Sequence, residues 1–169
     1  MTIFLCGFMG CGKSTVGKLL AKDLGMSFVD SDELIVEKEQ MSIPDIFSTN
    51  GEDYFRHIEA LTIRSLCGKN SVVACGGGAM LNNATADFAK KDGVVIFLDV
   101  PFNVCYDRIK GDSNRPIVAS SSQKQLLKRF DERYPVYSAN SSFAVCCDTS
   151  ASECCSLIKN ALSDFGRSL

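Results

Sequence analysis

The chain has 169 residues, enough for one sizeable hydrophobic core and short for two, so we expect a single domain spanning residues 1–169. Its 18 basic and 20 acidic residues leave a net charge of −2 with no long run of either sign, which argues against nucleic acid or an anionic membrane as partner. No stretch approaches the roughly 18 apolar residues of a membrane span, and the N-terminus leads straight into a glycine-rich loop, so we expect a cytoplasmic protein without a signal peptide.

The nine cysteines are many for this length, and a disulfide framework has to be considered. Their number is odd, no export signal precedes them, and several lie inside apolar patterns where cysteine acts as a small hydrophobe. The neighbouring pairs Cys146-Cys147 and Cys154-Cys155 lack the C-x₂-C spacing of a zinc site. We therefore expect free thiols.

A phosphate-binding motif follows the first apolar run, Ile3–Cys6, which we expect to be a buried strand. Gly7–Ser14 fits G-x-x-x-x-G-K-[ST], in which the glycines let successive N–H groups point at phosphate oxygens. A helix beginning near Ser14 adds a partial positive charge at the same anion. Lys13 would reach the β- and γ-phosphates, and the Ser14 hydroxyl would ligate Mg²⁺.

Two carboxylates follow the second expected strand, Ser27–Asp30, which comes after a helix ending near Leu24. Asp30 and Asp32 stand where a parallel strand delivers its carboxyl end to a ligand. Ser and Asp also favour the N-cap of a helix, and the residues from Glu33 onward continue helically. Both roles remain open on these residues alone.

The next expected helices are a short one from Ser42, broken at Asn50-Gly51, and a longer one over Glu52–Cys67. Arg56 and Glu59 lie one turn apart on the longer helix, the spacing of an ordinary surface ion pair.

A continuously apolar run, Ser71–Cys75, predicts a third strand, and Gly76-Gly77-Gly78 follows it. Three glycines at the end of a strand suggest backbone pressed against a ligand, although a plain tight turn would also use them. A helix to Lys91, the strand Val94–Val100 and a helix from Pro101 to about Lys110 come next.

Residues 111–123 form the one segment of low hydrophobicity, with Arg115-Pro116 in its middle. A flexible loop carrying an arginine is typical of a closing lid and equally of a solvated linker. After it we expect a helix over Lys124–Arg133, the segment Arg133–Tyr137, a strand over Phe143–Cys147 and a terminal helix. Strands alternating with helices predict a parallel sheet covered on both faces.

Together these motifs resemble the shikimate kinase family over nearly the whole chain. The resemblance rests on six features in order: Gly7–Ser14, Asp30-Ser31-Asp32, Phe55-Arg56-x-x-Glu59, Gly76-Gly77-Gly78, Arg115-Pro116 and Arg133-x-Pro135-x-Tyr137. It implies an α/β fold of the P-loop nucleoside-monophosphate-kinase type, with three layers, a five-stranded parallel sheet, a substrate-binding segment at about 31–60 and a mobile lid at about 111–123. The implied reaction transfers the γ-phosphoryl group of ATP to the 3-hydroxyl of shikimate.

The resemblance also implies catalytic roles for Lys13, Asp32 and Arg115. Asp32 would hold the ring hydroxyls and either accept or orient the attacking proton. Arg115, brought in by lid closure, would stabilise charge on the transferring phosphoryl group. Asp30 would support Mg²⁺ through water, alongside Ser14.

Binding residues follow from the same resemblance. Arg56 and Arg133 would bind the shikimate carboxylate, and Glu59 would orient Arg56. The amides of Gly76 to Gly78 would contact the substrate. The nucleotide contacts would come from Gly10, Cys11, Gly12, Lys13, Ser14, Thr15, Arg108 and Arg115. Arg108 would lie against the adenine, and we expect the protein to act as a monomer on a small molecule.

Two alternatives are weighed against this interpretation. A gluconate-kinase-like enzyme would also bind a carboxylate and hydroxyls, but it leaves the joint presence of the Arg56 and Arg133 motifs unexplained. A non-catalytic nucleotide switch would not need Asp32 opposite the phosphates, and its partner binding would survive the loss of Asp32.

One residue inside the loop raises a separate hypothesis. Cys11 lies close to the expected phosphates, and a helix N-terminus lowers a thiol pKa. Oxidation or alkylation of Cys11 is therefore expected to inactivate the enzyme.

Overall fold

The structure, a computed structural model, describes residues 1–111 and 121–167. Within these residues the strands form one five-stranded sheet with the order β2-β3-β1-β4-β5, and every neighbouring pair is parallel. The strands are β1 (Thr2–Cys6), β2 (Ser27–Asp30), β3 (Ser71–Ala74), β4 (Gly93–Asp99) and β5 (Phe143–Cys146). The expected five-stranded parallel sheet is confirmed.

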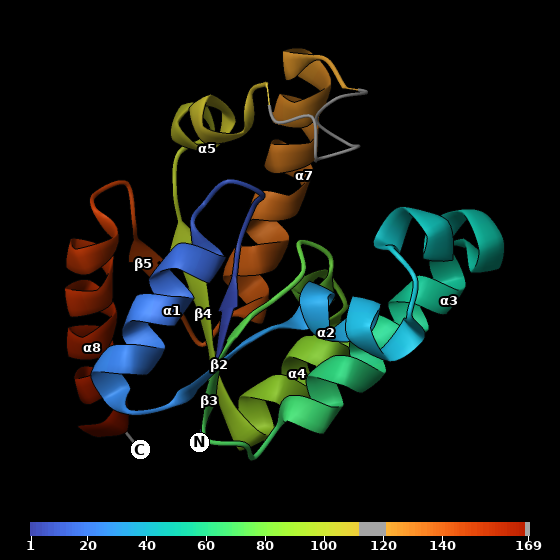
Figure 1. Ribbon diagram of the computed structural model, residues 1–169. Helices are drawn as coiled ribbons and strands as arrows, with labels where there is room; N and C mark the ends of the chain where they lie inside the picture. Colours follow the sequence, from blue (N-terminus) through green and yellow to red (C-terminus); the bar gives the residue numbers. More distant parts are fainter. Residues whose placement is uncertain (112–120, 168–169) are drawn as a thin grey trace.

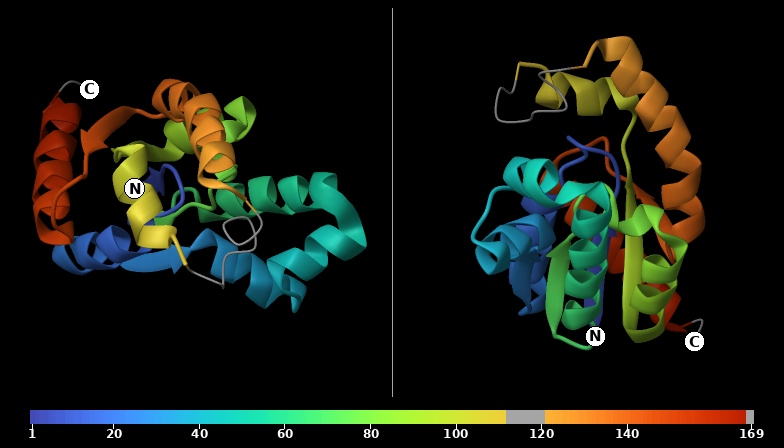
Figure 2. Two further views of the ribbon diagram at one scale, coloured as in Figure 1. Left: turned by 90° about the horizontal axis from the view of Figure 1, so that it is seen from above. Right: turned by 90° about the vertical axis from the view of Figure 1, so that its right-hand side faces the viewer.

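Helices cover both faces of the sheet, which gives the expected three layers (Figure 1). The helices are α1 (Lys13–Leu24), α2 (Ser31–Glu39), α3 (Ile43–Leu66), the 3-10 turn η1 (Ala79–Leu81), α4 (Asn83–Asp92), α5 (Phe102–Ile109), α7 (Gln123–Asn140) and α8 (Ala151–Arg167). α1 and α8 pack together on one face, while α4, α3 and α7 lie on the other, as the two turned views also show (Figure 2). None of the described helices is both long and apolar enough to cross a membrane.

The central strand β1 positions the site. Leu5 pairs with Ala74 of β3 on one side and with Ile96 of β4 on the other. The chain leaves β1 through α1 toward β2 and later returns to the opposite side as β4, so the strand order reverses at β1. Ligands of open α/β sheets bind at the carboxyl ends of the strands beside such a reversal, because loops there diverge and leave a crevice.

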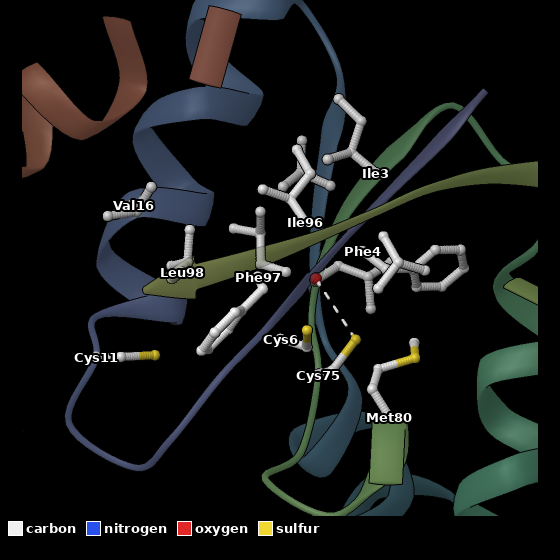
Figure 3. Packing of buried hydrophobic residues seen from close by; sticks show 14 of the residues in the cluster. Ile3, Phe4, Cys6, Cys11, Val16, Cys75, Met80, Ile96, Phe97 and Leu98 are labelled. Carbon is white, nitrogen blue, oxygen red and sulfur yellow. Dashed lines mark hydrogen bonds between the residues drawn. The ribbon is translucent and has the colours of Figure 1, made fainter. Parts of the chain in front are cut away.

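Two hydrophobic clusters hold these layers. The larger surrounds β1 and β4, whose central residues are fully buried, and Figure 3 shows part of it around Phe4, Ile96 and Met80. The smaller, of Ile35, Ile46 and Phe55, lies in the segment that we expect to bind substrate. All nine cysteines fall in the described part of the chain and none forms a disulfide, so the expectation of free thiols is confirmed.

Two helices differ from or refine the expectation. α3 is one helix over Ile43–Leu66, but Gly51 interrupts it with φ 85° and ψ 171°, at the break expected there. The expected end of a helix at Arg133 is wrong, because α7 continues through Pro135 to Asn140. Proline loses one helical hydrogen bond, yet contacts beyond it keep the helix in place: the Asn140 side-chain amide donates to the Met80 carbonyl over 2.9 Å.

Candidate active site

The phosphate loop links the end of β1 to the start of α1. Gly10 has φ 81°, and a side chain there would place its Cβ 2.5 Å from the Cys105 carbonyl oxygen, so only glycine fits. Gly12 is the N-cap of α1 and brings no side chain to the first-turn N–H groups. Those groups therefore have no capping side chain as acceptor, which leaves them for a bound anion at the helix N-terminus.

Lys13 closes the loop on itself. Its Nζ donates to the carbonyl oxygens of Gly7, at 3.0 Å, and Phe8, at 3.1 Å, and lies 3.7 Å from the Cys11 sulfur. These bonds hold the ammonium group at the loop, where a phosphate oxygen could replace a carbonyl as its partner.

Cys11 faces the protein interior. The residue is 2% exposed, and its thiol points from the loop toward Phe97 (Figure 3). A Cβ on Gly7 would lie 3.0 Å from its sulfur, so the thiol fills space beneath the loop. Burial opposes attack on this thiol, and the hypothesis that oxidation or alkylation of Cys11 inactivates the enzyme stays a prediction.

Ser14 and Asp30 meet directly beside the loop. The Ser14 hydroxyl donates to Asp30 Oδ2 over 2.9 Å, and Asp30 Oδ1 accepts the Asp32 amide over 3.1 Å, which makes Asp30 the N-cap of α2. Both roles considered for Asp30 are thus compatible. A hydroxyl and a carboxylate oxygen are hard ligands of the kind that Mg²⁺ prefers, so this pair fits the metal that the motif implies.

Asp32 is a half-buried acid of the site, with its Oδ1 turned into the protein. Its Oδ1 has no hydrogen-bond partner among the described residues. Burial raises the pKa of Asp32, and the nearby Asp30 raises it further, while Lys13 and Arg56 oppose these effects. A carboxyl group with a raised pKa and one oxygen without a hydrogen-bond partner is a candidate for accepting or directing a proton.

The glycine turn after β3 lies under this acid. A Cβ on Gly76 would collide with Asp32 Oδ1 and lie 2.9 Å from Glu59 Oε1, and one on Gly78 would collide with the Arg56 guanidinium. Gly76 and Gly78 therefore allow a close approach of side chains, whereas a Cβ on Gly77 would meet no atom closer than 3.7 Å. The Gly76 amide donates to Ser31 Oγ over 2.8 Å, and the substrate contact expected of this glycine stays a prediction. The contacts expected of Gly77 and Gly78 stay predictions.

Arg56 is held by two carboxylates of α3. Its Nη1 donates to Glu59 Oε2 over 2.8 Å, as the expected orienting role of Glu59 requires. Its Nε and Nη2 donate to Glu52 Oε1 over 3.2 and 3.1 Å, a contact not anticipated although the i,i+4 spacing could have suggested it. Burial raises the pKa of Glu59, and Arg56 offsets part of that effect.

Arg133 reaches the same region from α7. Its Nη1 donates to the Gly77 carbonyl over 3.2 Å, and the Tyr137 hydroxyl donates to the same oxygen over 2.6 Å. Arg56, Arg133 and Gly78 line one cavity of about 300 Å³. Two guanidinium groups on one small cavity suit a ligand with a carboxylate. The sequence motif included Tyr137, but its hydrogen bond to the Gly77 carbonyl was not predicted.

Two further side chains lie at the phosphate loop, those of Arg108 and Phe8. Arg108 of α5 donates from Nη1 to the Gly10 carbonyl over 3.2 Å, which places it on the phosphate loop. Arg115 lies outside the described residues. Phe8 of the loop packs edge-on against Phe130 of α7, with ring centres 5.2 Å apart.

Comparison with known proteins decides the family. The family model described as shikimate kinase matches residues 9–163. The chain belongs to the shikimate kinase family. Among curated members of that family, the enzyme of Sulfurihydrogenibium sp. is 47% identical over 80% of this chain and 81% of its own length. That of Persephonella marina is 44% identical over 80% of this chain and 82% of its own length.

Solved structures agree with the family. The shikimate kinase of Aquifex aeolicus is 36% identical, covers 100% of this chain and 99% of its own, and superposes with a TM-score of 0.85. The Acinetobacter baumannii shikimate kinase in complex with shikimate is 34% identical over 96% of this chain and 93% of its own, with a TM-score of 0.88. A Sinorhizobium meliloti gluconokinase is 17% identical, covers 98% of this chain and 91% of its own, and has a TM-score of 0.58, which shows a shared fold alone.

Proposed function

We propose that this chain transfers the γ-phosphoryl group of ATP to the 3-hydroxyl of shikimate, giving shikimate 3-phosphate and ADP. The observation that carries the proposal is one cavity lined by Arg56, Glu59 and Arg133. Asp32 and Glu59 both lie against Gly76, and Asp32 is close enough to Arg56 and to Lys13 of the phosphate loop for both cations to lower its pKa. Membership of the shikimate kinase family supports the same reaction. A carboxylate anchored by the arginines would leave the ring hydroxyls free to face Asp32.

The phosphate loop would bind ATP. The open N–H groups at the start of α1, with the loop amides from Gly10 to Thr15, would hold the phosphates. Lys13 would exchange its contacts with the Gly7 and Phe8 carbonyls for contacts with the β- and γ-phosphates. Arg108 would flank the adenine from its position on the loop.

Ser14 and Asp30 would hold the magnesium ion that accompanies ATP, Ser14 directly and Asp30 through water. Their hydrogen bond of 2.9 Å brings the two oxygens to the same point beside the loop. When bound, Mg²⁺ neutralises charge on the β- and γ-phosphates.

Asp32 would accept or orient the proton of the attacking hydroxyl. A raised pKa suits this task, because an acceptor works best when its pKa lies close to the working pH. Arg115, which lies outside the described residues, stays a prediction as the lid arginine that stabilises the transferring phosphoryl group. The monomeric state and the cytoplasmic location also stay predictions.

The first test is an assay of ADP release by the purified protein with Mg-ATP, comparing shikimate, gluconate and no acceptor. Stimulation by shikimate alone is expected. Lys13→Ala should lower turnover by a factor of ten or more, because the loop loses its cation, while circular dichroism should show an intact fold. Equal stimulation by gluconate, or none by shikimate in protein that still binds ATP, would contradict the proposal.

A further inference from the structure

The guanidinium group of Arg56 is shared between two carboxylates that differ in environment. Glu59 is 4% exposed in its side chain and accepts from Nη1 alone, whereas Glu52 is 65% exposed and a single oxygen of it accepts from both Nε and Nη2. The Nε and Nη2 pair is an edge of the guanidinium that can bind an incoming carboxylate through two parallel bonds. Glu52 thus occupies the edge of Arg56 that the carboxylate of a substrate would bind.

The two carboxylates are not equally replaceable. An exposed ion pair contributes little to stability, because water solvates the separated charges almost as well. Breaking the pair with Glu59 would instead leave a buried charge uncompensated, at a far higher cost. Stacking of Arg56 against Phe55, with 5.3 Å from the guanidinium carbon to the ring centre, also fixes the cation whichever anion it meets. The weaker partner, Glu52, is therefore the one that an incoming anion can displace.

We infer that Glu52 is an internal anion that the carboxylate of the acceptor displaces from the Nε and Nη2 edge of Arg56. Glu59 stays in place and keeps the guanidinium oriented throughout. The inference rests on the proposed function, in which Arg56 binds the shikimate carboxylate. Glu52 then sets the affinity for carboxylate acceptors: each binding event must first release it into solvent, and its return assists product release.

The alternative role for Glu52 is that of a clamp that orients Arg56 while substrate binds elsewhere. The two roles have opposite consequences. Removing a competitor strengthens acceptor binding, whereas removing a clamp weakens it. Ligands without a carboxylate cannot take the place of Glu52, so their affinity should not depend on it.

The test compares Glu52→Gln with Asp53→Asn, which removes the same charge from the neighbouring exposed position of α3. We expect Glu52→Gln to lower the KM for shikimate by about 1.5- to 5-fold, the range set by exposed ion pairs. Asp53→Asn should leave that KM unchanged. Calorimetric titration should show a matching gain in shikimate affinity for Glu52→Gln and none for the methyl ester of shikimate.

Several results would overturn the inference. A raised or unchanged KM in Glu52→Gln would do so, as would an equal decrease in Asp53→Asn, which would reveal a general charge effect. If the wild type shows no turnover with shikimate, the proposed function and this inference both fail. If the wild type turns over shikimate normally and the KM of Glu52→Gln is raised or unchanged, or Asp53→Asn shows an equal decrease, this inference alone fails.

Discussion

Asp32 shows how a single residue links activity to pH. Its pKa is raised above the ordinary aspartate value by burial and by Asp30. If its ionised form accepts or orients the proton, kcat/KM for shikimate should rise with pH on the acid side, with a midpoint above the ordinary value of 3.8. Asp32→Asn should remove this limb together with most of the activity. A pH profile of kcat/KM measures both, and a wild-type midpoint at or below 3.8 would contradict the assignment.

The same residue should reduce stability. Because its folded pKa lies above its unfolded pKa, the folded state binds more protons in the interval between them, and stability falls as pH rises through that interval. Asp32→Asn should therefore be more stable than the wild type at neutral pH. The gain should vanish below the unfolded pKa of an aspartate, about 3.9. Denaturant unfolding of both proteins at neutral pH and below that pKa would check the direction of the effect. Equal stability of the two proteins at neutral pH would contradict it.

Tyr137 offers a prediction about positioning. Its hydroxyl donates to the Gly77 carbonyl over 2.6 Å at a site where the residue is 2% exposed. Tyr137→Phe should cost about 0.5 to 1.5 kcal/mol of unfolding free energy, because the Gly77 carbonyl loses one of its two donors and keeps Arg133. It should also raise the KM for shikimate as the glycine turn loosens.

A matched control lies one turn earlier on α7. Tyr134, 37% exposed, donates its hydroxyl to Asp99 instead, so Tyr134→Phe removes the same group without touching the glycine turn. Thermal unfolding and acceptor titration would separate the two variants. Equal KM values in both would show that Tyr137 does not position the turn.

At the scale of elements, the break in α3 depends on one glycine. Gly51 combines φ 85° with ψ 171°, a region that side chains exclude. Gly51→Ala should destabilise the protein by about 1 to 3 kcal/mol, although no atom lies within 4 Å of the added methyl group. The cost would be purely conformational.

Gly166 in α8 provides the comparison. It also has no atom within 4 Å of an added Cβ, and its φ lies outside the left-handed region. Gly166→Ala should therefore be neutral or stabilising by up to about 1 kcal/mol, since alanine favours a helix. Denaturant titration of both variants measures the difference in their unfolding free energies. Equal unfolding free energies would show that the backbone at Gly51 accepts alanine without strain.

Elements were predictable where local pattern decides them. The buried strands and the break at Asn50-Gly51 follow from hydrophobic runs and glycine. The path of α7 through Pro135 was not predictable, because local rules end a helix near proline and the contacts of Tyr137 and Asn140 that override them come from distant parts of the chain.

For the whole molecule, the sequence predicted that the motifs gather at one edge of the sheet, and the parallel strand order brings the described motifs there. Phosphate loop, aspartates and glycine turn each follow a strand, and parallel strands bring their carboxyl ends together. What it could not supply were contacts decided by side-chain position, such as Ser31 taking the Gly76 amide and Glu52 occupying Arg56.

The helix α7 contacts both the phosphate loop and the acceptor cavity, so it can couple the binding of nucleotide to the binding of acceptor. Through Phe130, α7 contacts Phe8 of the phosphate loop, and through Arg133 and Tyr137 it holds Gly77. If a nucleotide shifts the loop, we expect α7 to pass part of that shift to Gly77 and the acceptor cavity. We expect shikimate to change the affinity for ADP by some factor, and ADP to change the affinity for shikimate by that same factor. Paired calorimetric titrations measure it, and Phe130→Ala should bring it toward one.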